Sequence, residues 1–290
     1  EVMGEGVSMG PLNDDMRRRN TARQGDIRYD IEWSTLGGYM EWLVERGISP
    51  NVASFIGAAN PRMMVIGYDD RPATPAELDE MADIVRAAMA EGALGVASSL
   101  IYPPGSFAST EELTVLARAA AESGGMYVSH LRNEAAQLLE AIDELLTIAR
   151  DARTRAEVYH LKASGRSNWH LMDRAIEKIE RARAEGLEIT ADVYAYPAGS
   201  TGLNAAMPPW IQEGGFEASL ERLRDPELRR RIAREMNEES DAWENMYLGA
   251  GTPDNILLVG FETDARNPRA GKRSSEVPRS RLASPEEPAM

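Results

Sequence analysis

Cysteine is absent from this 290-residue chain, which excludes disulfides, thiolate nucleophiles and thiolate zinc ligands. No apolar run approaches the ~20 residues that a membrane-spanning helix needs. Basic residues are outnumbered, with 32 Lys and Arg against 47 Asp and Glu. The resulting net charge of −15 disfavours nucleic acid and anionic membranes as partners, because it has the wrong sign for phosphate. None of these absences fixes the cellular compartment.

The composition predicts a folded domain. With 43% hydrophobic residues the chain can bury a sizeable core, as one large domain with or without an excursion. The chain begins at Glu1 rather than at Met, and its first four residues are typical of the end of an apolar strand. Residues 266–290 are rich in Pro, Arg, Ser and Glu and predict no complete element. We therefore expect both ends to be cut from a longer protein.

A strand-and-helix unit repeats through the middle of the chain. Short apolar segments begin at Leu94, Met126, Glu157 and Glu188, so that successive starts are 32, 31 and 31 residues apart. That spacing is about the length of one βαβ unit, ~30 residues. Apolar residues at helical spacing predict helices over 75–89, 110–120, 138–149 and 172–182, a short helix over 39–45 and a strand over 52–56. The repeat indicates a parallel sheet with right-handed crossovers.

Two architectures share that pattern, a closed (β/α)8 barrel and an open doubly wound sheet. His130, His160 and Tyr194 follow consecutive strands, and a barrel brings such strand ends to one mouth. The barrel is therefore favoured. After Tyr194 the repeat stops, and the sequence predicts charged helices over 216–238 and a strand over 256–261. We expect a partial barrel over 1–201, and an inserted cap with a cut C-terminal segment over 202–290.

The chain has only three histidines, and two of them could bind a metal. His130 and His160 are 30 residues apart, at equivalent points of adjacent βα units, which places both imidazoles on one rim. Two neutral imidazoles that converge suit a divalent metal, above all zinc. The alternative is that each histidine binds a backbone carbonyl at the rim. His170, at the start of a helix, is expected to face solvent.

A catalytic zinc site usually has three protein ligands and one open position. Spacing alone cannot choose the third ligand among 47 acidic residues. Glu5 is a candidate because it follows an apolar segment and lies between Gly4 and Gly6, where the backbone can approach a metal closely. A Gly-Glu-Gly string is also found in ordinary turns.

Five strings together resemble the N-acyl-D-amino-acid deacylases of the amidohydrolase superfamily. They occur in order along nearly the whole chain: residues 4–12 (GEGVSMGPL), 92–105 (GALG and LIYPPG), 129–134 (SHLRNE), 159–169 (YHLKASG and NW) and 190–203 (TADVYAYP and STGL). The resemblance implies an incomplete (β/α)8 TIM-type barrel containing about strands 2–7, with an insertion after strand 7. It implies hydrolysis of N-acyl-D-amino acids, which are small-molecule substrates, to a carboxylate and a D-amino acid.

The resemblance also assigns roles to residues. His130, His160 and Glu5 would be metal ligands after the fifth, sixth and second barrel strands, holding one tightly bound Zn²⁺ and allowing a second, weaker one. Lys162 and Tyr194 would face the substrate, although a solvated lysine and a packed aromatic are the plain alternatives. Arg132 and Glu134 would form a supporting pair.

Departures from the family pattern leave two other interpretations open. The family's His-x-His pair would precede residue 1 and its catalytic Asp would follow residue 290, so no catalytic residue is assigned within this chain. The chain could therefore be a truncated copy without catalysis. A cyclic-amide amidohydrolase, of the hydantoinase or dihydropyrimidinase kind, is the other alternative. It would need a carbamylated lysine, and residues 96–102 contain none.

Overall fold

The computed structural model of the chain describes residues 1–25, 27–261 and 269–277. Its centre is a parallel sheet in the order β3–β4–β5–β6–β7, and a parallel pair β1–β2 extends it, because β2 and β3 lie in one extended segment. The strands are β1 (Val2–Met3), β2 (Ala53–Ser54), β3 (Ile56–Gly57), β4 (Gly95–Ser99), β5 (Met126–His130), β6 (Ala156–Val158) and β7 (Ile189–Ala191).

The helices are α1 (Asp14–Ala22), α2 (Leu36–Arg46), α3 (Ala59–Val65), α4 (Pro75–Ala90), α5 (Thr110–Ala121), α6 (Leu138–Ala152), α7 (Met172–Ala184), α8 (Phe216–Arg224), α9 (Pro226–Met236) and α10 (Met246–Gly249). Side chains cap the first turn of six of the ten helices in the described residues, namely α1, α2, α4, α5, α9 and α10. At α4 the Thr74 hydroxyl accepts from the Glu77 amide, and the Glu77 carboxylate accepts from the Thr74 amide, with Pro75 in the first turn. This reciprocal cap satisfies two amides that the helix itself leaves unpaired.

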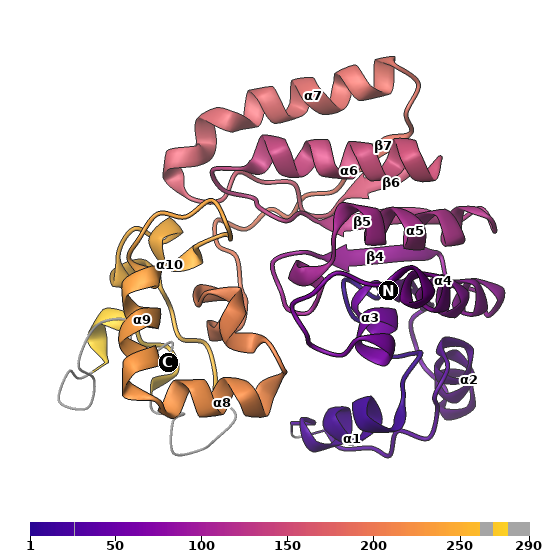
Figure 1. The fold of residues 1–290 in the computed structure, drawn as a ribbon, viewed down its shortest axis with the longest axis horizontal. Coiled ribbons are helices and arrows are strands. Elements are labelled where there is room, and N and C mark those ends of the chain that lie inside the picture. The colour runs from indigo at the N-terminus through magenta and orange to yellow at the C-terminus, as the bar shows by residue number, and fades with distance from the viewer. Residues whose placement is uncertain (26, 262–268, 278–290) are drawn as a thin grey trace.

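Helices α3 to α7 lie on one side of the sheet. Each packs against the next, α3 on α4, α4 on α5, α5 on α6 and α6 on α7, and Figure 1 shows α5, α6 and α7 stacked in this order. The main core lies between these helices and the strands, where Val85, Val96, Leu113, Leu116 and Ile142 have no exposed surface. Each such side chain stabilises the fold by roughly 1.5–3 kcal/mol.

The sheet is wound in a single direction. Strands β3 to β7 follow one another in chain order without a reversal, and every pairing between neighbours is parallel. A doubly wound sheet would reverse its strand order at a switch point and carry helices on both faces. The parallel sheet with crossover helices is as predicted, and the doubly wound alternative does not fit the part of the chain that the structure describes.

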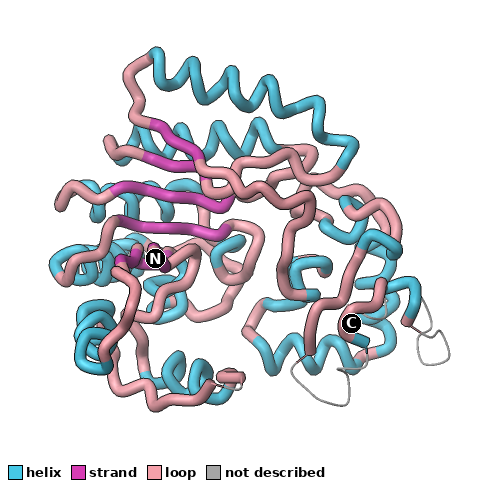
Figure 2. The backbone as a smooth tube through the Cα atoms, turned by 180° about the vertical axis from the view of Figure 1, so that it is seen from behind, coloured by secondary structure: helices cyan, strands magenta, loops and turns pink. Residues whose placement is uncertain are grey.

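A C-terminal lobe formed by α8, α9, α10 and short 3-10 turns lies beyond one end of the strands (Figures 1 and 2). Its small core contains Met207, Ile211, Ile232 and Met236. The predicted charged helices over 216–238 are α8 and α9. The predicted strand over 256–261 is wrong, because there Leu257 makes only an isolated antiparallel bridge to Arg273. Leu257 and Val259 are 56% and 70% exposed and only Leu258 between them is buried, so the segment lacks the fully buried side chains of β4.

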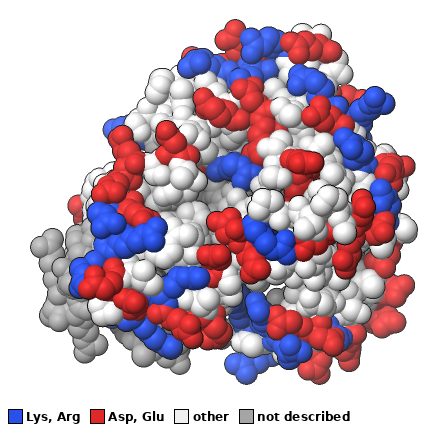
Figure 3. Space-filling model, in the orientation of Figure 1, with Lys and Arg blue, Asp and Glu red and all other residues white. Residues whose placement is uncertain are grey.

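Surface charge and helix length bear on possible partners. None of the helices within the described ranges combines the length and the apolar character that crossing a bilayer requires. Figure 3 shows acidic and basic side chains interspersed over one face of the molecule. On that face the acidic side chains are therefore not gathered into one separate patch.

Candidate metal centre

Glu5 is placed by two glycines whose conformation other residues adopt with difficulty. Gly4 and Gly6 have φ angles of +101° and +68°. A Cβ on Gly4 would lie 2.3 Å from the Phe55 carbonyl oxygen, and one on Gly6 would lie 2.6 Å from the Ser99 Cβ. The chain after β1 therefore passes tightly across the ends of β3 and β4. This path turns the Glu5 carboxylate toward the mouth of the sheet, where the Ser99 hydroxyl donates to it at 3.2 Å.

His130 is the last residue of β5 and is 5% exposed. Its register partner on β4 is Ser99, so the imidazole projects from the same edge of the sheet as the Glu5 contact. Tyr102 covers one side of the ring, with 5.5 Å between the two ring centroids. The strand therefore fixes where the His130 side chain starts, and Tyr102 packs against its ring.

His160 follows β6 in a left-handed backbone conformation, with φ of +37°. A non-glycine residue rarely adopts this conformation, and holding it costs about 1–3 kcal/mol. The Asp192 carboxylate, which follows β7, accepts a hydrogen bond from the His160 backbone amide and so helps to fix this conformation. The strain therefore aims the imidazole at a defined place, which is common at functional sites.

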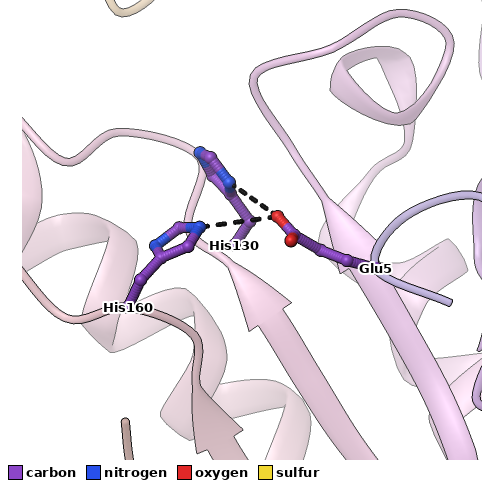
Figure 4. A group of neighbouring side chains, drawn as sticks. All are labelled: Glu5, His130 and His160. Atoms are coloured by element: carbon purple, nitrogen blue, oxygen red, sulfur yellow. Dashed lines mark hydrogen bonds and ion pairs between the residues drawn. The ribbon is translucent and has the colours of Figure 1, made fainter. Parts of the chain in front are cut away.

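Glu5, His130 and His160 converge on one point (Figure 4). Glu5 Oε1 lies 3.0 Å from His130 Nδ1 and 3.4 Å from His160 Nε2, and one ligand atom from each residue lies within 4.8 Å of the others. The two imidazole rings are perpendicular, with centroids 4.4 Å apart. Ligands bound to zinc at about 2.0–2.2 Å in a tetrahedron lie roughly 3.4 Å from one another. The donor set and its spacing therefore fit a divalent metal.

The same contacts shift the ionisation of the three groups. Hydrogen bonds to His130 and then to His160 hold the pKa of Glu5 far below its ordinary value. Burial would lower the pKa of His160, but the carboxylates of Glu134 and Glu5 outweigh it and raise that pKa to about 9. A metal at His160 therefore has to displace a proton below that pH.

Metal-free chain is expected to lose stability as the pH rises from about 6.5 to above 9. The folded-state pKa of His160 lies above the ordinary 6.5, so its proton stabilises the fold fully below pH 6.5 and this contribution is lost as the pH passes through 9. The loss should be on the order of 1–3 kcal/mol. Urea unfolding with a chelator at pH 6.5 and 9.5 measures it. A His160→Gln chain that shows the same loss would contradict the assignment to His160.

Glu134 and Lys162 lie beside the two histidines. Glu134 is 1% exposed, and its Oε2 lies 2.5 Å from Lys162 Nζ while its Oε1 lies 3.0 Å from His160 Nδ1. The expected pair of Arg132 with Glu134 is wrong, because Arg132 binds Glu144 through two contacts of 2.8 Å. The long Arg132 side chain reaches Glu144 on α6. It also donates to two backbone carbonyls of the loop after β4.

Tyr194 lies beside His160, whereas a separate cavity has a lining that includes neither residue. The Tyr194 ring lies 6.1 Å from the His160 ring and 5.6 Å from Lys162 Nζ, and the residue is 38% exposed. A cavity of about 400 Å³ lies between the loops after β4 and β5 and the C-terminal lobe. Its lining includes Leu100, Phe107, Met207, Trp210 and Glu244. The exposed His170, by contrast, binds the Ser167 carbonyl at 2.8 Å and takes no part in this cluster.

Sequence reasoning missed three acidic residues of the site, Glu134 as a histidine contact, Asp192 and Glu244. Glu244 comes from the C-terminal lobe, and its Oε2 accepts from the Glu134 amide at 2.6 Å. Burial raises the pKa of Glu244. A signal was available only for Asp192, which directly follows an expected strand end as the histidines do. Nothing in local spacing distinguishes Glu134 or Glu244 from other acids.

Comparison with known proteins finds no matching family profile but does find relatives. An N-acyl-D-glutamate deacylase of Alcaligenes xylosoxydans xylosoxydans is 34% identical over 151 residues, which are 52% of this chain and 31% of that protein. A D-aminoacylase of the same organism is 32% identical over 163 residues, 56% of this chain and 34% of that protein. Its N-acyl-D-aspartate deacylase is 31% identical over 200 residues, 68% of this chain and 39% of that protein. The chain thus spans well under half of these relatives.

A solved structure supports the same relationship. The crystal structure of N-acyl-D-glutamate deacylase from Bordetella bronchiseptica, complexed with zinc and a phosphonate inhibitor that mimics the tetrahedral intermediate, superimposes with a TM-score of 0.73. It is 27% identical, and the match covers 99% of this chain and 51% of that one. The resemblance that the five sequence strings predicted is therefore confirmed.

Proposed function

We propose that this chain contains the zinc-binding residues of an enzyme that hydrolyses the amide bond of N-acyl-D-amino acids. The products are a carboxylate and a D-amino acid. One observation carries the proposal: Glu5, His130 and His160 converge at the ends of three strands in a chain whose relatives are deacylases of this kind. The position fits a hydrolase, because active sites of parallel α/β barrels are built at the carboxyl ends of the strands.

The metal we propose is one zinc ion held by Glu5, His130 and His160, with room for a second, weaker ion. Two imidazoles and a carboxylate suit zinc, and three protein ligands leave a position open for water or substrate. Zinc bound there would lower the pKa of a water molecule and polarise the scissile carbonyl. Glu5 supplies the negative charge of the site, and its strongly lowered pKa keeps it ionised at neutral pH. Proton delivery to the departing amine is not assigned to a residue of this chain.

Lys162 and Tyr194 are the proposed substrate-binding residues. Lys162 Nζ already contacts Glu134 and the His160 carbonyl, at 2.5 and 3.2 Å. Lys162 Nζ also lies 2.8 Å from His160 Nδ1, so its three donors all face groups of the chain, and a substrate carboxylate would replace one of these contacts. Lys162 is 29% exposed at its side chain and Tyr194 lies beside it, so both can reach a molecule in the mouth. The role of Tyr194 would be to bind the amide carbonyl.

The finer description of the fold is also a proposal. We place residues 1–201 in a (β/α)8 barrel of the amidohydrolase type, with β1 to β7 contributing about strands 2–7. Residues 202–290 would form an insertion that caps the mouth. The single winding direction, the helices on one side of the sheet and the position of the C-terminal lobe support this arrangement.

Two alternatives make different predictions. A cyclic-amide hydrolase that bridges two metals with a carbamylated lysine needs a lysine near the end of β4, and residues 95–102 have none. A copy without catalysis would keep the fold but hydrolyse nothing. The absence of a His-x-His pair from this sequence favours that second alternative for the 290-residue chain taken alone.

Hydrolysis of N-acetyl-D-methionine separates these possibilities. The assay uses zinc-loaded protein, both as the 290-residue chain and with the coding sequence on either side included, and compares N-acetyl-L-methionine and hydantoin as substrates. We expect the D-isomer to be hydrolysed by at least one form, with release of D-methionine. Ring opening of hydantoin instead would favour the cyclic-amide enzyme. No hydrolysis by either form would contradict the proposal.

A further inference from the structure

The carboxylate of Glu134 lies behind both candidate metal ligands. Its Oε1 is 3.0 Å from His160 Nδ1 and its Oε2 is 3.7 Å from His130 Nε2. These are the ring nitrogens that point away from Glu5, whose Oε1 faces His130 Nδ1 and His160 Nε2. Each imidazole therefore stands between two carboxylates, with Glu5 on the metal side and Glu134 on the far side.

The chemistry of a metal-bound imidazole requires a hydrogen-bond acceptor on the far side. A neutral ring carries one proton, so a ring that binds a metal through one nitrogen carries that proton on the other. With ligation through His130 Nδ1 and His160 Nε2, the protons would lie on His130 Nε2 and His160 Nδ1. Lys162 contacts His160 Nδ1 at 2.8 Å but is a donor only, so it cannot accept this proton. Glu134 can accept both.

Buried polar atoms around Glu134 support this assignment. Both Glu134 oxygens and His130 Nε2 are buried and lack a well-aligned hydrogen bond within the described ranges. An unsatisfied buried polar group costs about 1–3 kcal/mol, and more when it is charged. The Glu134 oxygens have ion-pair contacts with His160 and Lys162, whereas His130 Nε2 faces Glu134 Oε2 without a hydrogen bond, so a small closing movement would pair these two atoms. The 3.7 Å separation at His130 is the gap that such a movement has to close.

Three hydrogen bonds fix the backbone at and next to Glu134. Its amide donates to Glu244 Oε2 at 2.6 Å, and its carbonyl accepts from the Ser164 amide at 2.7 Å. The preceding side chain, Asn133 Oδ1, accepts from the Ala135 amide at 2.9 Å and closes the turn that leads into α6. A residue fixed in this way can set the orientation of the side chains that it contacts, as supporting residues of metal sites do.

We propose that Glu134 is a positioning residue that fixes the tautomer and the ring orientation of both His130 and His160, so that their other nitrogens meet at the metal position. The inference rests on the proposed metal centre. The competing explanation is that Glu134 serves only as the counterion of Lys162, which it contacts at 2.5 Å.

The test compares zinc affinity in wild-type chain and in Glu134→Gln, by competition with a chromophoric chelator. Glutamine keeps the size of the side chain but loses the charge and one acceptor oxygen. We expect zinc affinity to fall about 10- to 100-fold, the usual effect of removing such a partner. Glu112→Gln is the matched control, because Glu112 is 2% exposed and ion-paired but contacts Arg62 rather than a histidine. It should leave zinc affinity unchanged even though it lowers stability.

Crystal structures of the metal-free wild-type and Glu134→Gln chains give a second measurement. We expect the two imidazoles to turn away from their shared point in the variant. If zinc affinity and ring orientation are both unchanged in Glu134→Gln, the positioning role is wrong and the metal centre stands. If wild-type chain binds no zinc, the proposed metal centre is wrong, and the ring orientations alone decide whether Glu134 positions the histidines.

Discussion

Replacing His130 by alanine is expected to remove high-affinity zinc binding from this chain. The change deletes one of three candidate ligands at the rigid end of β5, where no other described His, Asp or Glu completes a cluster with Glu5 and His160. The loss should exceed the ~10- to 100-fold that follows removal of an outer hydrogen-bond partner, because a ligand contributes directly to the metal. Metal content after dialysis, together with competition titration, measures the change.

His170→Ala is the matched control for this prediction. His170 is the third histidine of the chain, it is exposed, and its ring binds a backbone carbonyl within its own turn. Its removal should leave zinc affinity unchanged within error. Equal zinc content in the His130→Ala and wild-type chains would contradict the metal centre, and a large loss in His170→Ala would show that the zinc binds elsewhere.

Replacing Glu112 by alanine is expected to lower the free energy of unfolding by about 3–5 kcal/mol. Arg62 on α3 and Glu112 on α5 form an ion pair of 2.6 Å, with exposed side-chain fractions of 0% and 2%. Arg62 also donates to the carbonyls of Asp69 and Arg71, in the connection that leads to α4. The alanine would leave the Arg62 charge buried without its counterion, while the guanidinium stayed fixed by that connection.

The wild-type pair need not itself be a large source of stability. Burial raises the pKa of Glu112 even though Arg62 lies beside it, so desolvation offsets much of the attraction. Chemical denaturation measures the change on replacement, with Glu122→Ala as the exposed counterpart. Glu122 contacts Arg86 at 2.7 Å with 48% of its side chain exposed, so its loss should cost far less than the loss of Glu112. Equal effects of the two changes would contradict the argument from burial.

The regular part of the fold could be predicted from sequence because it follows from periodicity. The segments that begin near Leu94, Met126, Glu157 and Glu188 lead into β4 to β7, and the apolar stripes between them became α5, α6 and α7. Shorter elements gave no such signal. Helices α1 and α3, of 9 and 7 residues, were not expected, and the 256–261 segment was assigned a strand from its apolar residues alone.

The candidate site was only partly within reach of sequence reasoning. The repeat places His130 and His160 on neighbouring strand ends, so their approach follows from the register of a parallel sheet. The position of the Glu5 carboxylate next to the histidines depends on the positive φ angles of Gly4 and Gly6. The sequence permits these angles but does not require them. Glu134 and Glu244 reach the site through loop geometry and a second lobe, and neither leaves a spacing pattern.

A crystal structure of zinc-loaded chain, with anomalous scattering recorded on both sides of the zinc absorption edge, shows whether Glu5, His130 and His160 share one metal ion. We expect one strong zinc peak bound by Glu5 Oε1, His130 Nδ1 and His160 Nε2, each at about 2.0–2.2 Å. A zinc peak at other residues, or none at this position in crystals grown with excess zinc, would contradict it.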